Sequence, residues 1–157
     1  MCAWGNLVLP APGPGQFLSI TSSIFGCLGV AVPYAIAAKL AHPEKTVIAT
    51  TGDGSFGLTC MEMETAVRHG IPFVVVVGND QGWGMIKRDV EKQQRVPVGA
   101  CELGPTRYDQ IVEGMGGHGE YVEHPDEIGP AIQRALDSGL PACVNVITDP
   151  KIGPGLG

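Results

Sequence analysis

Hydrophobic positions along the chain alternate between helix-like and strand-like spacing. A run of small apolar residues, rich in alanine and closed by a His-Pro pair, predicts a buried helix from about Gly29 to Ala41, with Pro33 near its first turn. The β-branched segment Lys45 to Thr51 then predicts a short strand. A second helix is expected from Phe56 to His69, with Gly70 as its stop.

The second half of the chain continues the same alternation. Its clearest strand is the unbroken apolar run Phe73 to Val77, which is typical of a parallel strand buried on both faces. A loop with some charge is expected from Gln81 to Gly104. The remaining predicted elements are helix, strand, helix and strand at about Thr106–Met115, Gly119–Val122, Pro125–Ser138 and Ala142–Thr148. Strands that alternate with helices predict an α/β fold, a mainly parallel sheet with helices on both faces.

The length and the ends of the chain predict a single domain. The chain has 157 residues, about the size of one domain and short for a complete multi-domain enzyme. Residues 1–22 include a segment rich in proline and glycine and are interpreted as an extended entry arm. The domain itself is expected over residues 23–149, and residues 150–157 are expected to form a flexible tail.

Composition narrows the class of protein. Hydrophobic residues make up 44% of the chain and charged residues 17%, which argues against disorder. The net charge of −6 argues against nucleic acid as a partner. Five widely spaced cysteines match neither a disulfide framework nor a metal site, so we expect them to be reduced. No signal-peptide pattern or run of ~18 apolar residues occurs, so no membrane association and a cytoplasmic location are expected.

The informative polar residues follow the first two predicted strands. One turn is Gly52-Asp53-Gly54-Ser55, and the other is Gly78-Asn79-Asp80-Gln81-Gly82. In a parallel sheet ligands bind beyond the carboxyl ends of the strands. Because a single helix joins the two strands, we expect them to be neighbours and their terminal turns to lie close together.

The first turn allows two interpretations of its ligand. Its glycines fit G-x-G-x-x-G between a strand and a helix, the pattern of a nicotinamide or flavin dinucleotide site. Asp53 would then press against a pyrophosphate with no cation to compensate, which is unfavourable. A Mg²⁺ ion held by Asp53 and Asp80 removes the conflict, because the metal bridges carboxylates to phosphate oxygens. The alternative without a ligand is that both aspartates only cap turns.

These motifs resemble a known family. "GDGS" (Gly52 to Ser55) followed by "GNDQGWG" (Gly78 to Gly84) resembles the diphosphate-binding signature of thiamine-diphosphate-dependent enzymes of the acetolactate synthase, benzaldehyde lyase and 2-hydroxyacyl-CoA lyase group. The resemblance extends from about Gly26 to Pro150. It implies that the metal ligands are Asp53, Asp80 and the main-chain carbonyl of Gly82. The chain has Asn-Asp where the commonest family pattern is Asn-Asn, and aspartate keeps the oxygen ligand.

The same resemblance implies a set of cofactor-binding residues. Leu28, in the loop "FGCLG", corresponds to the bulky apolar residue that supports the bent cofactor, and Trp83, Met85 and Ile86 correspond to positions near the thiazolium or the substrate. A tryptophan that helps to select substrate in acetolactate synthases is replaced by Asp89. The expected cofactor-binding residues are Gly26, Leu28, Gly52, Asp53, Gly54, Ser55, Asp80, Gly82, Trp83, Gly84 and Met85.

The resemblance also indicates what the chain lacks. Family members use a glutamate on a separate pyrimidine-binding domain to activate the cofactor, and Glu62 and Glu64 follow the diphosphate turn in the wrong place for it. No catalytic residue is therefore assigned. The resemblance implies part of a lyase, decarboxylase or carboligase acting on 2-oxo acids or 2-hydroxyacyl compounds, possibly acyl-CoA thioesters. The partner would be a second chain in a hetero-oligomer or a same-chain domain lost by truncation.

Two other functions stay open. A non-catalytic module would bind thiamine diphosphate and Mg²⁺ without turnover under any pairing, and a nicotinamide-binding oxidoreductase domain would bind its cofactor independently of Mg²⁺.

Overall fold

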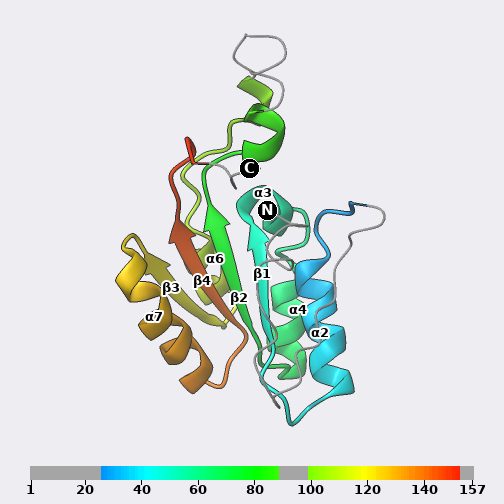
Figure 1. The fold of residues 1–157 in the computed structure, drawn as a ribbon. Coiled ribbons are helices and arrows are strands. Elements are labelled where there is room, and N and C mark those ends of the chain that lie inside the picture. The colour runs from blue at the N-terminus through cyan, green and yellow to red at the C-terminus, as the bar shows by residue number, and fades with distance from the viewer. Residues whose placement is uncertain (1–25, 89–98, 153–157) are drawn as a thin grey trace, which may run out of the picture.

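Four parallel strands form the sheet in a computed structural model that describes residues 26–88 and 99–152. The strand order is β1-β2-β4-β3, with every neighbouring pair parallel (Figure 1). The elements are α2 Ala31–Ala41, β1 Ile48–Gly52, α3 Asp53–Gly57, α4 Glu62–His69, β2 Val74–Asn79, the 3-10 turn η1 Gly99–Cys101, α6 Tyr108–Gly114, β3 His118–Val122, α7 Pro125–Asp137 and β4 Ala142–Ile147. The predicted fold class is confirmed.

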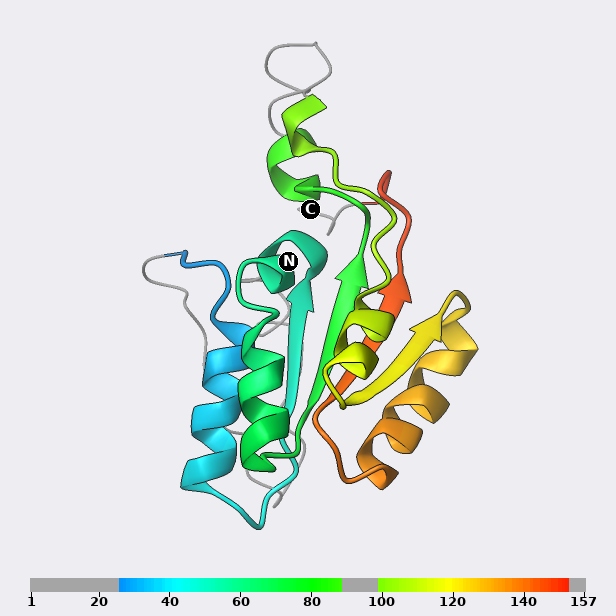
Figure 2. The ribbon, with the colours of Figure 1, turned by 180° about the vertical axis from the view of Figure 1, so that it is seen from behind.

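Helices cover both faces of this sheet. On one face α2, α4 and α6 contribute Val32, Met63 and Val112 to a core that also contains Val75 and Val77 of β2. On the other face α7 packs Ala131 and Ala135 against Val74, Val144 and Val146 (Figures 1 and 2). Alternate residues of β2 thus enter two different cores, which explains why the sequence of that strand is apolar without alternation.

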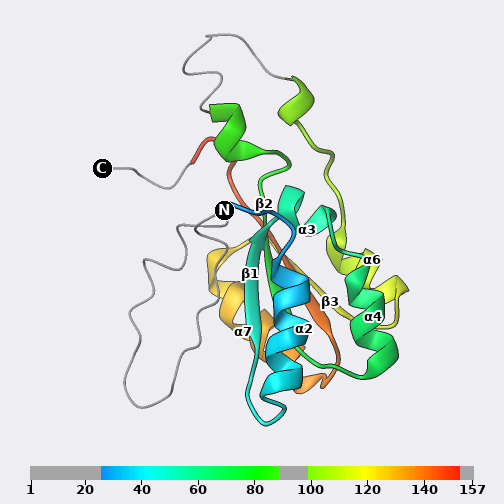
Figure 3. The same ribbon diagram turned by 90° about the vertical axis from the view of Figure 1, so that its right-hand side faces the viewer.

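The register brings the ends of β1 and β2 to the same level. Gly52 of β1 pairs with Gly78 of β2. The next residues, Asp53 at the start of α3 and Asn79 at the end of β2, therefore lie at the same level of the sheet. Seen from the side, α3 begins directly where β1 ends, at the edge toward which β2 also points (Figure 3). The expectation that the two turns share one edge of the sheet is confirmed.

The single helix predicted over Phe56 to His69 is wrong, because the segment forms two helices with a turn between them. α3 ends at Gly57 and α4 begins at Glu62. In the intervening turn the hydroxyl of Thr59 donates a 2.7 Å hydrogen bond to the carbonyl of Gly29, from a segment far away in the sequence. Tertiary contacts of this kind override the local preference for a continuous helix. Gly70 ends α4 at φ 61°, as expected.

The long loop predicted from Gln81 to Gly104 is also partly wrong. Residues 84–88 are helical, and η1 adds a 3-10 turn near the other end. Met, Lys and Arg are good helix formers, and the helical segment begins with a 2.8 Å hydrogen bond from the Lys87 amide to the Trp83 carbonyl. Asp89, the position compared with a substrate-selecting tryptophan, lies outside the described residues.

The other predicted elements agree with the structure to within three residues at each end. The entry arm and residues 153–157 lie outside the described residues, so the proposed division of the chain stays a prediction. Among the described residues, no helix has both the length and the hydrophobicity needed to cross a membrane. Of the described cysteines, Cys101 and Cys143 are buried whereas Cys27 is exposed.

Candidate cofactor-binding site

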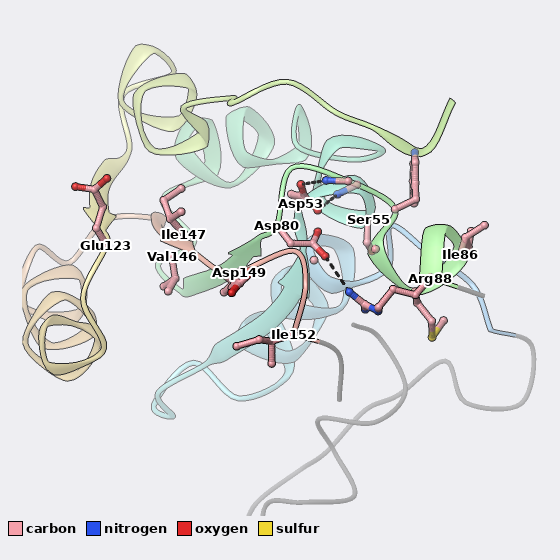
Figure 4. A pocket seen from close by; sticks show the side chains of 18 of the residues that line it. Asp53, Ser55, Asp80, Ile86, Arg88, Glu123, Val146, Ile147, Asp149 and Ile152 are labelled. Carbon is pink, nitrogen blue, oxygen red and sulfur yellow. Dashed lines mark hydrogen bonds and ion pairs between the residues drawn. The ribbon is translucent and has the colours of Figure 1, made fainter. Parts of the chain in front are cut away.

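A cavity of about 580 Å³ lies at the carboxyl edge of the sheet, between the two predicted turns (Figure 4). Its lining brings together ten of the eleven residues expected from the sequence, namely Leu28, Gly52, Asp53, Gly54, Ser55, Asp80, Gly82, Trp83, Gly84 and Met85. Gly26 is not among the lining residues; it lies in the exposed turn before Leu28 with φ 61°.

The carboxylate of Asp53 joins the two turns. Its side chain is buried, with the residue only 2% exposed. One oxygen, Oδ1, accepts a 2.8 Å hydrogen bond from the amide of Gly54, and Oδ2 accepts a 3.0 Å hydrogen bond from the amide of Gly82. The loop after β2 is therefore attached to the turn after β1 through the side chain that the sequence singles out.

The charge at this position favours a cation as ligand. Burial raises the pKa of Asp53, and the nearby carboxylate of Asp80 raises it further, while the amide hydrogen bonds oppose both effects. Two carboxylates that face one cavity repel each other, and a divalent cation between them relieves both the repulsion and the loss of hydration. The donor set therefore fits Mg²⁺. Within the described part of the chain no group of three His, Cys, Asp or Glu side chains suits a metal, so phosphate and main-chain oxygens would complete the shell.

Asp80 already has a partial counter-ion. Nη1 of Arg88 lies 3.7 Å from Oδ2 of Asp80 and also donates a 3.2 Å hydrogen bond to the carbonyl of Pro150 (Figure 4). Residues 78–82 form the turn after β2, and we call this turn the metal loop because it carries Asp80 and Gly82, the expected metal ligands. Arg88 comes from the helical segment after the metal loop and lines the same cavity. The guanidinium is one positive charge at the edge of the pair, and a Mg²⁺ ion would bring two.

Three glycines allow the loops to approach so closely. A Cβ atom at Gly54 would lie 2.8 Å from Cε3 of Trp83, and one at Gly82 would lie 2.9 Å from the carbonyl oxygen of Cys101. A Cβ atom at Gly84 would overlap the carboxylate of Asp80. These glycines therefore have a packing reason, because a side chain at any of them would meet the facing loop.

The upstream loop is attached to the same turn. The hydroxyl oxygen of Ser55 accepts a 2.9 Å hydrogen bond from the amide of Gly29, which has φ 77°. This contact gives Ser55 a structural role beside its expected role with the cofactor. It holds Leu28, which is 38% exposed, at the wall of the cavity.

Sequence reasoning did not identify Arg88 or the part of the lining that comes from the segments after β3 and β4. Arg88 and the residues that follow β3 and β4, which are Glu123, His124, Thr148, Asp149 and Ile152, all face the cavity. A signal was available, because the carboxyl ends of all parallel strands meet at one edge. Those later loops carry no recognisable motif, so only the strand order assigns them to the site.

The comparison with protein families decides which group this site belongs to. Residues 1–146 match the family described as thiamine pyrophosphate enzyme, C-terminal TPP-binding domain. The chain belongs to this family. The predicted resemblance and the thiamine diphosphate cofactor, with the Mg²⁺ that accompanies it, are confirmed at the level of the family, which favours them over the dinucleotide interpretation.

Relatives of this thiamine pyrophosphate enzyme domain have several activities. The chain is 50% identical over 140 residues to the acetolactate synthase large subunit IlvG of Mycobacterium tuberculosis, covering 88% of this chain and 25% of the relative. It is 40% identical over 132 residues to sulfoacetaldehyde acetyltransferase of Alcaligenes xylosoxydans xylosoxydans, covering 84% and 22%. It is 35% identical over 139 residues to 2-hydroxyacyl-CoA lyase of Arabidopsis thaliana, covering 85% and 24%. The chain thus spans about a quarter of these proteins.

A solved structure has the same fold. The thiamine diphosphate-dependent 4-hydroxybenzoylformate decarboxylase of Rhodococcus jostii RHA1 superposes with a TM-score of 0.72 at 25% identity, over 78% of this chain and 23% of the decarboxylase. The thiamine pyrophosphate enzyme domain described here is therefore a part of a larger architecture in each relative.

Proposed function

We propose that this chain is the diphosphate- and Mg²⁺-binding part of a thiamine-diphosphate-dependent lyase, decarboxylase or carboligase that acts on 2-oxo acids or 2-hydroxyacyl compounds. The observation that carries the proposal is the meeting of Asp53 and Asp80 at one cavity, from two turns that a hydrogen bond to Asp53 already joins. Hard oxygen ligands, with phosphate completing the shell, are the usual way in which proteins hold Mg²⁺.

Each side of the cavity has a role in this proposal. Asp53, Asp80 and the carbonyl of Gly82 would hold the metal, and the turn at Gly52, Gly54 and Ser55 would bind the phosphates. Leu28, Trp83, Met85 and Ile86 give the cavity an apolar wall. Such a wall suits a thiazolium ring that must be partly removed from water. When bound, thiamine diphosphate supplies an electron sink for making or breaking a carbon–carbon bond next to a carbonyl.

The activity would need a partner domain. The chain covers about a quarter of its relatives, so most of the machinery in those proteins lies elsewhere. Of the two glutamates near the diphosphate turn, Glu64 is paired with Arg68 on the surface of α4, and neither is among the residues lining the cavity. An activating carboxylate is therefore expected from a pyrimidine-binding domain, on a second chain or on another part of the same protein.

The relatives support a broad class of substrates. A synthase, an acetyltransferase and a CoA lyase are all relatives at 35–50% identity. We therefore keep both 2-oxo acids and acyl-CoA thioesters as candidate substrates.

Calorimetric titration with thiamine diphosphate, with and without Mg²⁺, tests the metal site. The wild-type chain should bind only when Mg²⁺ is present, and Asp53→Ala should abolish the binding. Asp137→Ala, which removes an exposed carboxylate at the end of α7, is the matched control and should bind normally. Binding that is independent of Mg²⁺ and unchanged in Asp53→Ala would overturn the assignment.

A mixing experiment tests the partner requirement. Lyase or carboligase turnover is expected only when the chain is combined with a pyrimidine-binding domain that carries the activating glutamate. Cofactor binding without turnover under every such pairing would support the non-catalytic module instead.

A further inference from the structure

A row of buried polar side chains lies behind the metal loop and takes no part in lining the cavity. It consists of Asn79 at the end of β2, Asn145 on β4 and Asp109 on α6, and it ends at Arg107 near the surface. Asn79, Asn145 and Asp109 are 1%, 0% and 3% exposed. We call these four residues the buried polar row. Polar groups buried this deeply are unfavourable unless fully hydrogen-bonded, so their arrangement requires an explanation.

Hydrogen bonds connect the row from end to end. Arg107 donates to Asp109 from Nε at 3.1 Å and from Nη2 at 2.6 Å. Asp109 Oδ1 accepts a 3.0 Å bond from Nδ2 of Asn145, and Asn145 Oδ1 accepts a 3.1 Å bond from Nδ2 of Asn79. No buried side-chain polar atom of the described residues lacks a partner.

The charge of Asp109 and the main-chain carbonyl of Thr106 together set the direction of the bonds in the row. That carbonyl accepts hydrogen bonds from Nδ2 of Asn79 at 3.1 Å and from Nδ2 of Asn145 at 3.4 Å. Burial raises the pKa of Asp109, but the hydrogen bonds from Arg107 and Asn145 outweigh it and hold the pKa below its ordinary value, so the side chain is ionised. An ionised carboxylate only accepts hydrogen bonds. Asn145 must therefore turn its amino group toward Asp109 and its carbonyl toward Asn79. Asn79 must in turn donate to Asn145, which leaves its own carbonyl oxygen for the loop.

The free carbonyl of Asn79 holds the metal loop. Its Oδ1 accepts a 3.2 Å hydrogen bond from the amide of Gln81. Gln81 has φ 58°, the only positive φ of a non-glycine residue in the described chain, and such a conformation needs support from its surroundings. A second bond, 2.7 Å from the Leu103 amide to the Gln81 carbonyl, holds its other side. The next residue is Gly82, whose amide reaches Asp53.

We propose that Arg107, Asp109 and Asn145 are positioning residues for the metal loop. Together with the carbonyl of Thr106, they fix the orientation of the Asn79 amide. This orientation keeps Gln81 in its unusual conformation and thereby directs the amide of Gly82 to Asp53 and its carbonyl to the proposed metal position. Only the last step rests on the proposed function, because the earlier steps concern hydrogen bonds within the chain itself.

Exchanging the two inner residues tests whether the match of donor and acceptor between positions 109 and 145 is what supports the loop. Asn145→Asp places a second carboxylate against Asp109 and removes the donor between them. The double variant Asp109→Asn/Asn145→Asp keeps the same charge as the wild type and restores a donor to the pair, with position 145 still accepting from Asn79. The single variant should lose the support of the metal loop, and the double variant should regain it.

The readout is amide hydrogen exchange of Gln81 and Gly82 in the cofactor-free 157-residue chain. Loss of one buried hydrogen bond should speed exchange at both amides about tenfold or more in Asn145→Asp, and the double variant should return to within about threefold of the wild type. A global loss of stability would instead speed exchange at core amides such as Val75 as well.

Val144→Ala is the matched control for stability. Val144 neighbours Asn145 on β4 but packs on the opposite face, against α7. This variant should lower the melting temperature without a selective effect at Gln81 and Gly82. The proposal is overturned if Asn145→Asp behaves like Val144→Ala, or if the double variant exchanges as fast as the single one.

A binding titration separates this inference from the proposed function. If the wild-type chain binds thiamine diphosphate with Mg²⁺, Asn145→Asp should lower the affinity for Mg²⁺ about tenfold. The double variant should restore that affinity. If the wild type does not bind the cofactor, the proposed function fails, whereas the exchange measurements still decide whether the row positions the loop.

Discussion

The indole of Trp83 lies against Gly54, so that a Cβ atom at position 54 would stand 2.8 Å from Cε3 of the ring. Gly54 belongs to the turn after β1, and Trp83 follows the loop after β2. The two residues are 29 positions apart in the sequence (83 − 54), and their motifs fit together as one surface. The fit is tight enough that a single methyl group tests it.

Gly54→Ala should displace Trp83 and weaken binding of thiamine diphosphate with Mg²⁺ by about tenfold or more, because the indole ring cannot yield without moving the loop that carries Asp80. Binding is measured by calorimetry, and the Trp83 emission is followed in a Trp4→Phe background, since the chain has two tryptophans. Adding Trp83→Ala should remove the clash and recover part of the affinity. Unchanged emission and affinity in Gly54→Ala would show that the two loops do not pack as described.

Gly84→Ala should lower Mg²⁺ affinity by moving a proposed ligand. The added Cβ would overlap the carboxylate of Asp80, which must then rotate away from the cavity. We expect the Mg²⁺ affinity, measured from cofactor binding at increasing Mg²⁺ concentrations, to fall about tenfold. Gly104→Ala is the matched control, because a Cβ at that position meets nothing within 4 Å. Equal Mg²⁺ dependence in the two variants would argue against Asp80 as a ligand.

The order and type of most elements follow from local patterns in the sequence. The apolar run that becomes β2, for example, could be interpreted as a strand because both of its faces are buried. The break between α3 and α4 could not be predicted, since it depends on a hydrogen bond from Thr59 to Gly29. Contacts between distant segments of this kind override local propensity and leave no local signature.

The site also contains residues that the sequence predicts and residues that it does not. Asp53, Asp80 and the glycines lie in motifs whose chemistry is readable, and the structure brings them to one cavity. Asn145 is the one polar residue of the apolar strand β4, and no motif in the sequence marks it as part of the site. Its importance depends on β4 lying directly beside β2, although α6, β3 and α7 lie between the two strands in the chain. The strand order is therefore the information that the sequence motifs lack.

Arg88→Gln should raise the affinity for Mg²⁺. The guanidinium lies 3.7 Å from Oδ2 of Asp80, and part of the metal's binding free energy is spent on displacing it. Because both side chains are partly exposed, the gain should be only about two- to fivefold. It is measured by Mg²⁺ titration in the presence of thiamine diphosphate, and it should shrink at high salt. Arg88→Lys keeps the charge and should resemble the wild type; a loss of affinity in Arg88→Gln would mean that Arg88 supports the ligand site.

Acid should remove the stabilisation that Asp109 provides. The folded state holds the pKa of Asp109 below its ordinary value of 3.8, through Arg107 and Asn145 and against the effect of burial. A carboxyl group with a lowered pKa stabilises the fold above its unfolded pKa, and this contribution is lost as the pH falls through the folded pKa. Asp109→Asn should therefore lower the free energy of unfolding by about 1–3 kcal/mol near neutral pH, the range for a hydrogen bond to a charged group.

The difference between the wild type and Asp109→Asn should then narrow as the pH falls below about 4 and vanish once Asp109 is protonated in both states. Urea unfolding of the two proteins over a pH series measures this difference directly. Asp137→Asn, which removes an exposed carboxylate, controls for the change in net charge. A constant difference at every pH would mean that the ionised form of Asp109 contributes nothing specific. The orientation of the Asn145 and Asn79 amides would then have to be fixed by the carbonyl of Thr106, to which both amino groups donate, and the buried polar row would no longer have a direction imposed by its charge.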